Sequence, residues 1–328
     1  MGLKVAPKVG AILFLLVSEA TVADALREPL WIENLSPLQS VIAIPPQGSA
    51  EGIEGVALTL HNDLATHFIA RQTDDEAVLF DGETQRTSLG LRWRFSPQWE
   101  ISARLPVLRH SGGFTDSYVN QWHDFFSMSD GGRSAVSEDQ LQYQYQAPGR
   151  DLSLTSSSAG VGDVAFEVSR LASQSAERKI AYVLGYEAAT GSARDWLGNG
   201  GVDWYALTRV SGQGSNGLPI YWHAQLGATR PAVGGFLATN SRSLLWFGGL
   251  SGEWVFDDRW SLVAQLDGHQ SAFQSSLDAV GKSALMVGLG LRRQFAKGWA
   301  ADIGFVEDIR VETAPDIISQ ATIRYRPD

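Results

Sequence analysis

The sequence predicts an all-β transmembrane protein, an antiparallel barrel of about twelve strands with one short amphipathic helix in a long extracellular loop. Three observations lead to this fold class. Alternating polar and apolar segments recur along the chain, an aromatic pair repeats at one end of several hairpins, and short connections alternate with long ones.

A period of two residues is typical of strands with one polar and one apolar face. In residues 99–105, Ile101 and Ala103 share one face with Trp99, and the residues between them are polar. Alternation alone would also fit a soluble β-sandwich with one wet face. We expect strands near 55–65, 84–95, 99–108, 161–171, 179–189, 202–211, 219–230, 243–256, 260–270, 283–295, 299–308 and 317–326.

Three hairpin turns repeat one aromatic pattern, a Phe and a Trp that enclose three turn residues. They are Phe95–Trp99, Phe256–Trp260 and Phe295–Trp299. In a membrane barrel such pairs form a girdle at the membrane–water boundary, beside short periplasmic turns. A sandwich has no physical reason to repeat an aromatic pair at one end, so the pattern favours the barrel.

The connections are of two kinds, as insertion of a barrel from the periplasm requires. The aromatic turns are short, whereas 109–160, 190–201, 231–242 and 271–282 are long. An even number of strands then puts both termini on the side of the short turns. The last strand, which ends in Tyr325, resembles the C-terminal strand signal of outer-membrane barrels, although Arg326-Pro327-Asp328 follow it.

The N-terminus reads as a secretory signal, with Lys4 and Lys8 before the apolar Val9–Val17 and the small-residue site Ala23-Asp24-Ala25. We therefore expect a signal peptide at 1–25, a periplasmic or plug segment at 26–54 and the transmembrane barrel at 55–328. Cysteine is absent, which excludes disulfides and thiolate metal sites. The net charge of -10 argues against binding to nucleic acid.

Short motifs before the first strand and in the long loop carry a family resemblance. They are Asn34-Leu35-Ser36-Pro37-Leu38, Pro45-Pro46, Gly113, Phe114, Asp116, His123-Asp124-Phe125-Phe126, Gly131, Gly132 and Arg133. With these motifs the chain resembles a family of proteobacterial outer-membrane barrels known only as a domain of unknown function. The resemblance covers essentially the whole mature chain. It implies a barrel in the outer membrane and carries over no activity.

The long loop 109–160 holds the one helical pattern of the mature chain, at 115–129. This helix is either a lid at the barrel mouth or an aromatic face lying on the outer leaflet or the rim. His123 and Asp124 lack the spacing of a metal site, and we expect no metal and no cofactor. The candidate residues of this loop are Tyr118, Trp122, His123, Phe125, Phe126 and Arg133.

Charged residues of mixed sign form the second candidate site, because the two-residue period points them into the barrel. They either set the ion preference of a water-filled lumen or form a salt-bridge network that holds the strands in register. The lumen-facing set is Arg92, Arg94, Glu100, Arg104, Glu167, Asp203, Arg209, Glu253, Asp267, Arg292, Asp302 and Arg324.

These features predict an outer-membrane barrel, with a narrow or gated channel for a small solute or amphiphile as its function. The alternatives are a structural or surface-interaction barrel with a plugged lumen and, third, a lipid-modifying enzyme. We expect no enzyme and assign no catalytic residue, because no G-x-S-x-G elbow is present and adjacent His110-Ser111 do not share a strand face. The expected partners are outer-membrane lipid, lipopolysaccharide and the barrel-assembly machinery.

Overall fold

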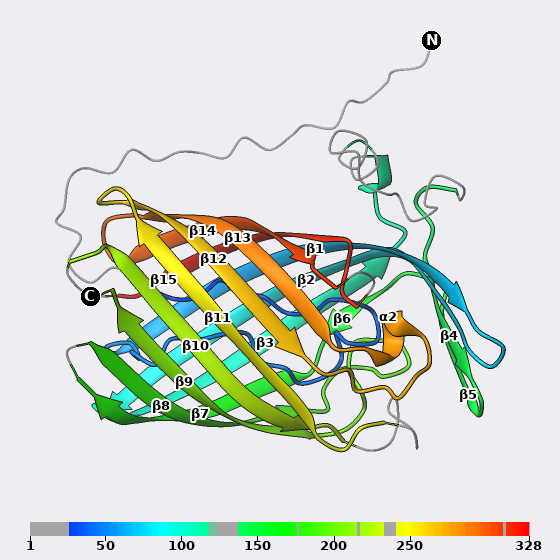
Figure 1. Ribbon diagram of the computed structural model, residues 1–328, viewed down its shortest axis with the longest axis horizontal. Helices are drawn as coiled ribbons and strands as arrows, with labels where there is room; N and C mark the ends of the chain where they lie inside the picture. The colour runs from blue at the N-terminus through cyan, green and yellow to red at the C-terminus, as the bar shows by residue number, and fades with distance from the viewer. Residues whose placement is uncertain are drawn as a thin grey trace, which may run out of the picture.

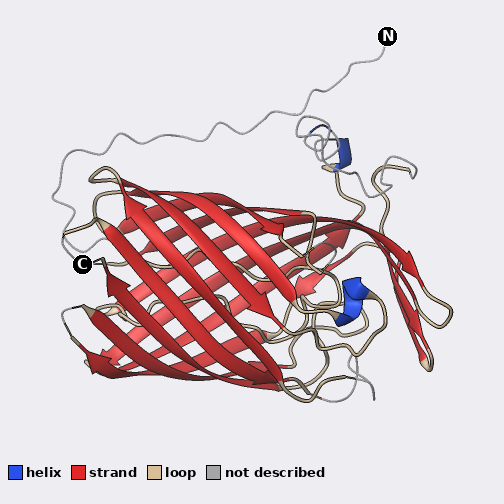
Figure 2. Cartoon of the chain, viewed as in Figure 1, coloured by secondary structure: helices blue, strands red, loops and turns tan. Residues whose placement is uncertain are grey.

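The structure is a computed structural model that describes residues 26–117, 121, 137–175, 177–214, 217–232, 241–310 and 313–327. Strands dominate the described residues, and Figure 2 shows helix only beside the mouth of a barrel. Among these residues no helix is long and apolar enough to cross a membrane. The expected signal peptide at 1–25 lies outside the described residues.

Twelve strands close into an antiparallel barrel, as the sequence predicts (Figure 1). Successive strands pair with each other, and β1 closes the wall by pairing with β15 from Leu58↔Tyr325 to Thr66↔Ile317. The wall consists of β1 (Val56–Gln72), β2 (Ala77–Ser96), β3 (Trp99–Ser111), β7 (Val164–Gln174), β8 (Arg178–Ala188), β9 (Asp203–Gln213), β10 (Ile220–Arg230), β11 (Leu245–Val255), β12 (Trp260–His269), β13 (Ala284–Gln294), β14 (Trp299–Asp308) and β15 (Ile317–Tyr325).

The outer face of this wall is apolar, with a girdle of aromatic side chains at the end that carries the short turns. Trp93 packs on Phe95 with ring centroids 5.8 Å apart, and Trp254 packs on Phe256 at 5.7 Å. Trp246, which is also exposed, lies eight residues before Trp254 on β11, near the opposite end. Eight residues span about 27 Å along a strand and about 20 Å of height at the usual tilt. This height matches the apolar band of a membrane barrel, about 25 Å.

The long connection between β3 and β7 differs from the prediction, because it contains three further strands. They are β4 (Gln142–Ala147), β5 (Arg150–Leu154) and β6 (Ser158–Val161). β4 and β5 form a hairpin on the extended start of β2, beyond the barrel mouth (Figure 1). The alternation of Gln and Tyr over 142–146, directly before Pro148-Gly149, is the signal in the sequence for this hairpin.

The predicted helix at 115–129 lies largely outside the described residues, as do Tyr118, Trp122, His123, Phe125, Phe126 and Arg133. Of its described residues, Asp116, Ser117 and Gln121 are helical. The structure also describes a short helix that the sequence does not predict, α2 (Asp278–Gly281), in the connection between β12 and β13. It has a single turn, too few residues for a recognisable helical period.

The turn between β13 and β14 gives a test of the barrel wall. Lys297 and Gly298 both have positive φ, and a Cβ on Gly298 would lie 1.8 Å from the carbonyl oxygen of Arg326. We expect Gly298→Ala to lower the free energy of unfolding by about 1–2 kcal/mol, because a residue with a Cβ is strained in the left-handed backbone conformation. The clash with Arg326 should increase this loss. Gly252→Ala is the control, since a Cβ there meets no atom within 4 Å. For each variant, the measurement is the midpoint temperature at which heating abolishes the compact form that migrates fast on a gel. Equal midpoints for the two variants would contradict the backbone strain assigned to position 298.

Candidate functional site

The lumen is occupied by the N-terminal segment, residues 26–54, most of which are buried. Its carbonyl oxygen at Leu26 accepts a hydrogen bond from Gln294, at the short-turn end of β13. The side-chain Nδ2 of Asn34 lies 3.0 Å from Nε2 of His269, which is at the opposite end of β12. The backbone N–H of Ile53 donates to Glu100, back near the short turns. The segment therefore runs to the far mouth and returns before β1 begins.

Seven of the twelve charges in the predicted lumen-facing set belong to two ion-pair networks. In the first, Arg292 is fully buried between Glu253 at 2.7 Å and Asp302 at 2.6 Å. Asp302 also pairs with Arg324. Arg27 of the N-terminal segment adds a second cation to Glu253 at 2.5 Å. Four wall strands, β11, β13, β14 and β15, and the segment are thereby held by one chain of charges.

The second network centres on Glu167 of β7. Its carboxylate accepts from Arg104 at 2.7 Å and from Arg209 at 3.2 Å, and the hydroxyl of Tyr205 donates to it at 3.1 Å. Two guanidinium groups thus share one carboxylate, so this part of the lumen keeps an excess of positive charge.

Most of the remaining predicted charges bind the N-terminal segment directly. Asp203 accepts from the backbone N–H of Ala43 at 3.1 Å, and Asp267 accepts from the side chain of Gln47 at 2.8 Å. Arg94 donates to the backbone carbonyl oxygen of Glu51 at 3.1 Å. The wall therefore satisfies the backbone of a segment that has no regular hydrogen-bond ladder of its own.

Charged and aromatic side chains of the segment complete this contact. Arg92 pairs with Glu28 of the segment and, at 2.7 Å, with Glu100 of β3. Arg86 pairs with Glu33 at 3.2 Å. Trp31, Glu28 and Glu33 are site residues that the sequence analysis missed. A segment without periodicity gives no signal about which side chains meet a distant wall.

Trp31 stacks on the ring of His61 with centroids 5.1 Å apart. His61 itself bonds Asp63 and Thr322 within the wall, at 2.7 and 2.9 Å. An aromatic contact of this kind adds about 0.5–1.5 kcal/mol beyond the area it buries. It fixes the position of the outward arm of the segment midway through the lumen.

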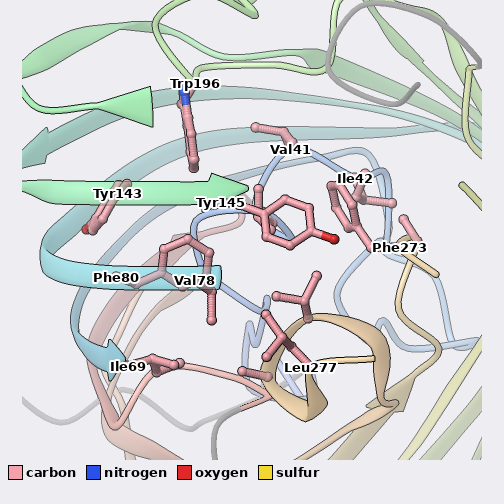
Figure 3. Packing of buried hydrophobic residues seen from close by; sticks show 14 of the residues in the cluster. Val41, Ile42, Ile69, Val78, Phe80, Tyr143, Tyr145, Trp196, Phe273 and Leu277 are labelled. Atoms are coloured by element: carbon pink, nitrogen blue, oxygen red, sulfur yellow. The ribbon is translucent and has the colours of Figure 1, made fainter. Parts of the chain in front are cut away.

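An apolar cluster closes the mouth that carries the long loops. Figure 3 shows Val41 and Ile42, at the tip of the N-terminal segment, near Tyr145 and Phe273. The cluster also includes Phe80 of β2 and other side chains from the β4–β5 hairpin and the loops at 189–202 and 270–283. We call this group the mouth cluster, and it fastens the tip of the segment by burial of apolar surface.

Glu76 joins the tip of the β1–β2 hairpin to the loop that follows β12. Its carboxylate accepts from the hydroxyl of Ser275 and the backbone N–H of Ser276, both at 2.7 Å. Partial burial alone would raise the pKa of Glu76, but these hydrogen bonds lower it below its ordinary value. The carboxylate is therefore a pH-sensitive fastening of the mouth cluster.

The histidines of the wall lie inside the barrel. His110 is buried and lies 3.0 Å from both Thr84 and the carbonyl oxygen of Trp196. His223 lies 2.8 Å from the hydroxyl of Ser211, which also accepts from the N–H of Ala50. A lipid-modifying hydrolase would need its Ser and His on lipid-facing positions. Among the described residues no group of three potential metal ligands is found.

Comparison with known proteins places the chain in a family. The model of a family described as a protein of unknown function, DUF3187, matches residues 9–326, and the chain belongs to that family. No curated protein matches it in sequence.

Solved structures share the barrel. An outer-membrane channel from Pseudomonas putida F1 is similar at a TM-score of 0.52 and 11% identity, over 87% of this chain and 97% of the channel. A toluene transporter from Ralstonia pickettii is similar at a TM-score of 0.41 and 8% identity, over 85% of this chain and 91% of the transporter. At this identity the first similarity shows a common fold.

The buried Arg292 tests the ion-pair network. Removing its charge in Arg292→Met leaves two carboxylates without their shared cation, and we expect a loss of about 3–5 kcal/mol in the free energy of unfolding. Lys282→Met is the matched control, because its pair with Asp278 is exposed and worth at most about 1 kcal/mol. Urea unfolding in detergent micelles measures both, and a loss no larger than that of the control would refute the network.

The lowered pKa of Glu76 gives a pH prediction. Its contribution to stability is complete above the ordinary pKa of a glutamate and is lost as the pH falls through the lowered value. We therefore expect the amides of Ser276 and Leu277 to lose protection from hydrogen exchange at low pH, relative to Glu76→Gln at each pH. The variant should lack protection at every pH; parallel profiles in the two proteins would disprove the role of the carboxylate.

Proposed function

We propose that this member of the DUF3187 family is a non-enzymatic channel for small solutes in the bacterial outer membrane, closed at rest by the N-terminal segment 26–54. The observation that carries the proposal is the path of the segment through the lumen, with Leu26 and Ile53 both near the short turns. The apolar outer face and its aromatic girdle support the membrane location. Lipid and lipopolysaccharide are the partners of that face.

The way the segment is held favours reversible closure. Signal cleavage near Leu26, as the sequence predicts, leaves the segment joined to the wall through β1 alone. The segment buries apolar surface against the wall through Leu30, Ile32 and Leu35. Its other contacts along the lumen include hydrogen bonds and ion pairs, such as that of Gln47 with Asp267. Water can replace such contacts at little net cost, because an average internal hydrogen bond contributes only about 0.5–1.5 kcal/mol.

A permanently plugged structural barrel is the second candidate, and the mouth cluster is the observation that favours it. Val41 and Ile42 pack there among aromatic side chains. Withdrawing them exposes apolar surface, at about 25 cal/mol for each Å². The two candidates differ in whether the segment ever leaves the lumen.

A reversible cross-link separates them. Ser49 of the segment and Ser211 of β9 have hydroxyl oxygens 3.3 Å apart, which suits a disulfide, and the chain has no native cysteine. We expect Ser49→Cys/Ser211→Cys to show no current in planar bilayers when oxidised and to open when reduced. The single variants should respond to neither treatment. Identical silence in both redox states and in the native protein would favour the plugged barrel.

A further inference from the structure

The N-terminal segment is acidic, whereas the wall around it offers cations. Residues 26–54 contain four glutamates and one arginine, a net charge of -3. Two of these glutamates, Glu28 and Glu33, pair with arginines of β2, and Glu51 pairs with Lys179 at 3.3 Å. The segment thus behaves as an anionic ligand of the wall.

Backbone oxygens of the segment serve further guanidinium groups. Arg324 donates to the carbonyl oxygen of Pro29 at 3.1 Å. The return arm passes so close to Arg209 that a Cβ on Gly48 would lie 2.8 Å from its guanidinium carbon. These arginines are therefore covered by the segment, and its departure would open them to solute.

A cavity lies between the segment and these arginines. The volume of this cavity is about 80 Å³, and the cavity is partly open to solvent. Its charged lining is Arg92, Arg104, Arg209, Arg324, Glu28 and Glu167. Four cations and two anions line the cavity, and one of the two anions, Glu28, belongs to the segment. Glu100 and Asp302 pair with Arg92 and Arg324 from outside the lining.

We infer that this cavity is a binding site for a small carboxylate solute, and that the Glu28 carboxylate occupies part of it in the closed state. Guanidinium groups bind carboxylates through paired hydrogen bonds. The Glu28 carboxylate already accepts a hydrogen bond from the guanidinium group of Arg92 and another from the N–H of Ser49 at 3.1 Å. This inference rests on the proposed channel function and names its substrate class.

Chemical rescue in the full-length protein tests the site without any conduction. We expect Glu28→Ala to lower the midpoint of heat-induced loss of the compact form. Sodium acetate should then restore at least half of that loss, whereas acetamide, its neutral analogue, at the same ionic strength should restore none. Glu28→Gln keeps the side-chain shape and should show a smaller loss with little rescue.

Two controls define the site. Glu54→Ala removes an exposed glutamate of the same segment and should change neither the midpoint nor the response to acetate. Glu28→Ala/Arg92→Gln should lose the response, because the carboxylate then lacks its partner. Equal effects of acetate and acetamide, or rescue that survives loss of Arg92, would overturn the inference.

Ion selectivity supplies the second measurement. In a KCl gradient, open channels of the native protein should give a reversal potential of the sign expected for anions. Arg209→Gln should move it toward zero, whereas Arg293→Gln, which removes an arginine packed on Trp260, should leave it unchanged. Conduction without anion preference would refute the carboxylate site alone. Absence of any current would refute the channel, while acetate rescue would still report on the site.

Discussion

The structure depends on the need to pair every charge that the wall points into a narrow lumen. A strand with an apolar outer face turns its polar residues inward, and buried charges are costly unless each finds a partner. Neighbouring strands satisfy part of this need, as Arg292 does between Glu253 and Asp302. The N-terminal segment satisfies much of the rest, with Arg27 and Glu28 at the short-turn end. Wall and segment therefore form one electrostatic unit.

The two ends of the segment are held by different forces. Near the short turns, hydrogen bonds and ion pairs that water can replace act beside a small apolar contact of Leu26 and Ile53 with Ala57. At the far mouth Val41 and Ile42 pack in an apolar cluster. Opening this cluster is unfavourable because it exposes apolar surface to water. Any signal that frees the segment therefore has to act on the mouth cluster, where Glu76 ties the β1–β2 hairpin to the neighbouring loop.

The wall could be predicted from the sequence because its determinants are local. A period of two residues and the Phe–Trp turns, such as Phe295–Trp299, lie within single hairpins, and all twelve expected strands are present. The contacts between the N-terminal segment and the wall could not be predicted in the same way. Pro29 and Arg324 are separated by 295 positions, and no periodicity links them. The β4–β5 hairpin could have been predicted, since Gln and Tyr alternate over 142–146, directly before a Pro-Gly turn.

The out-and-back path of the N-terminal segment also bears on how the protein is assembled. Since both arms pass through the same mouth, the chain is not threaded through the closed wall, and no knot forms. The β1–β15 seam can therefore close first, and the segment can then enter the closed barrel through one mouth. Formation of the wall and filling of the lumen are then separable folding steps, and the second takes place on the side of the short turns.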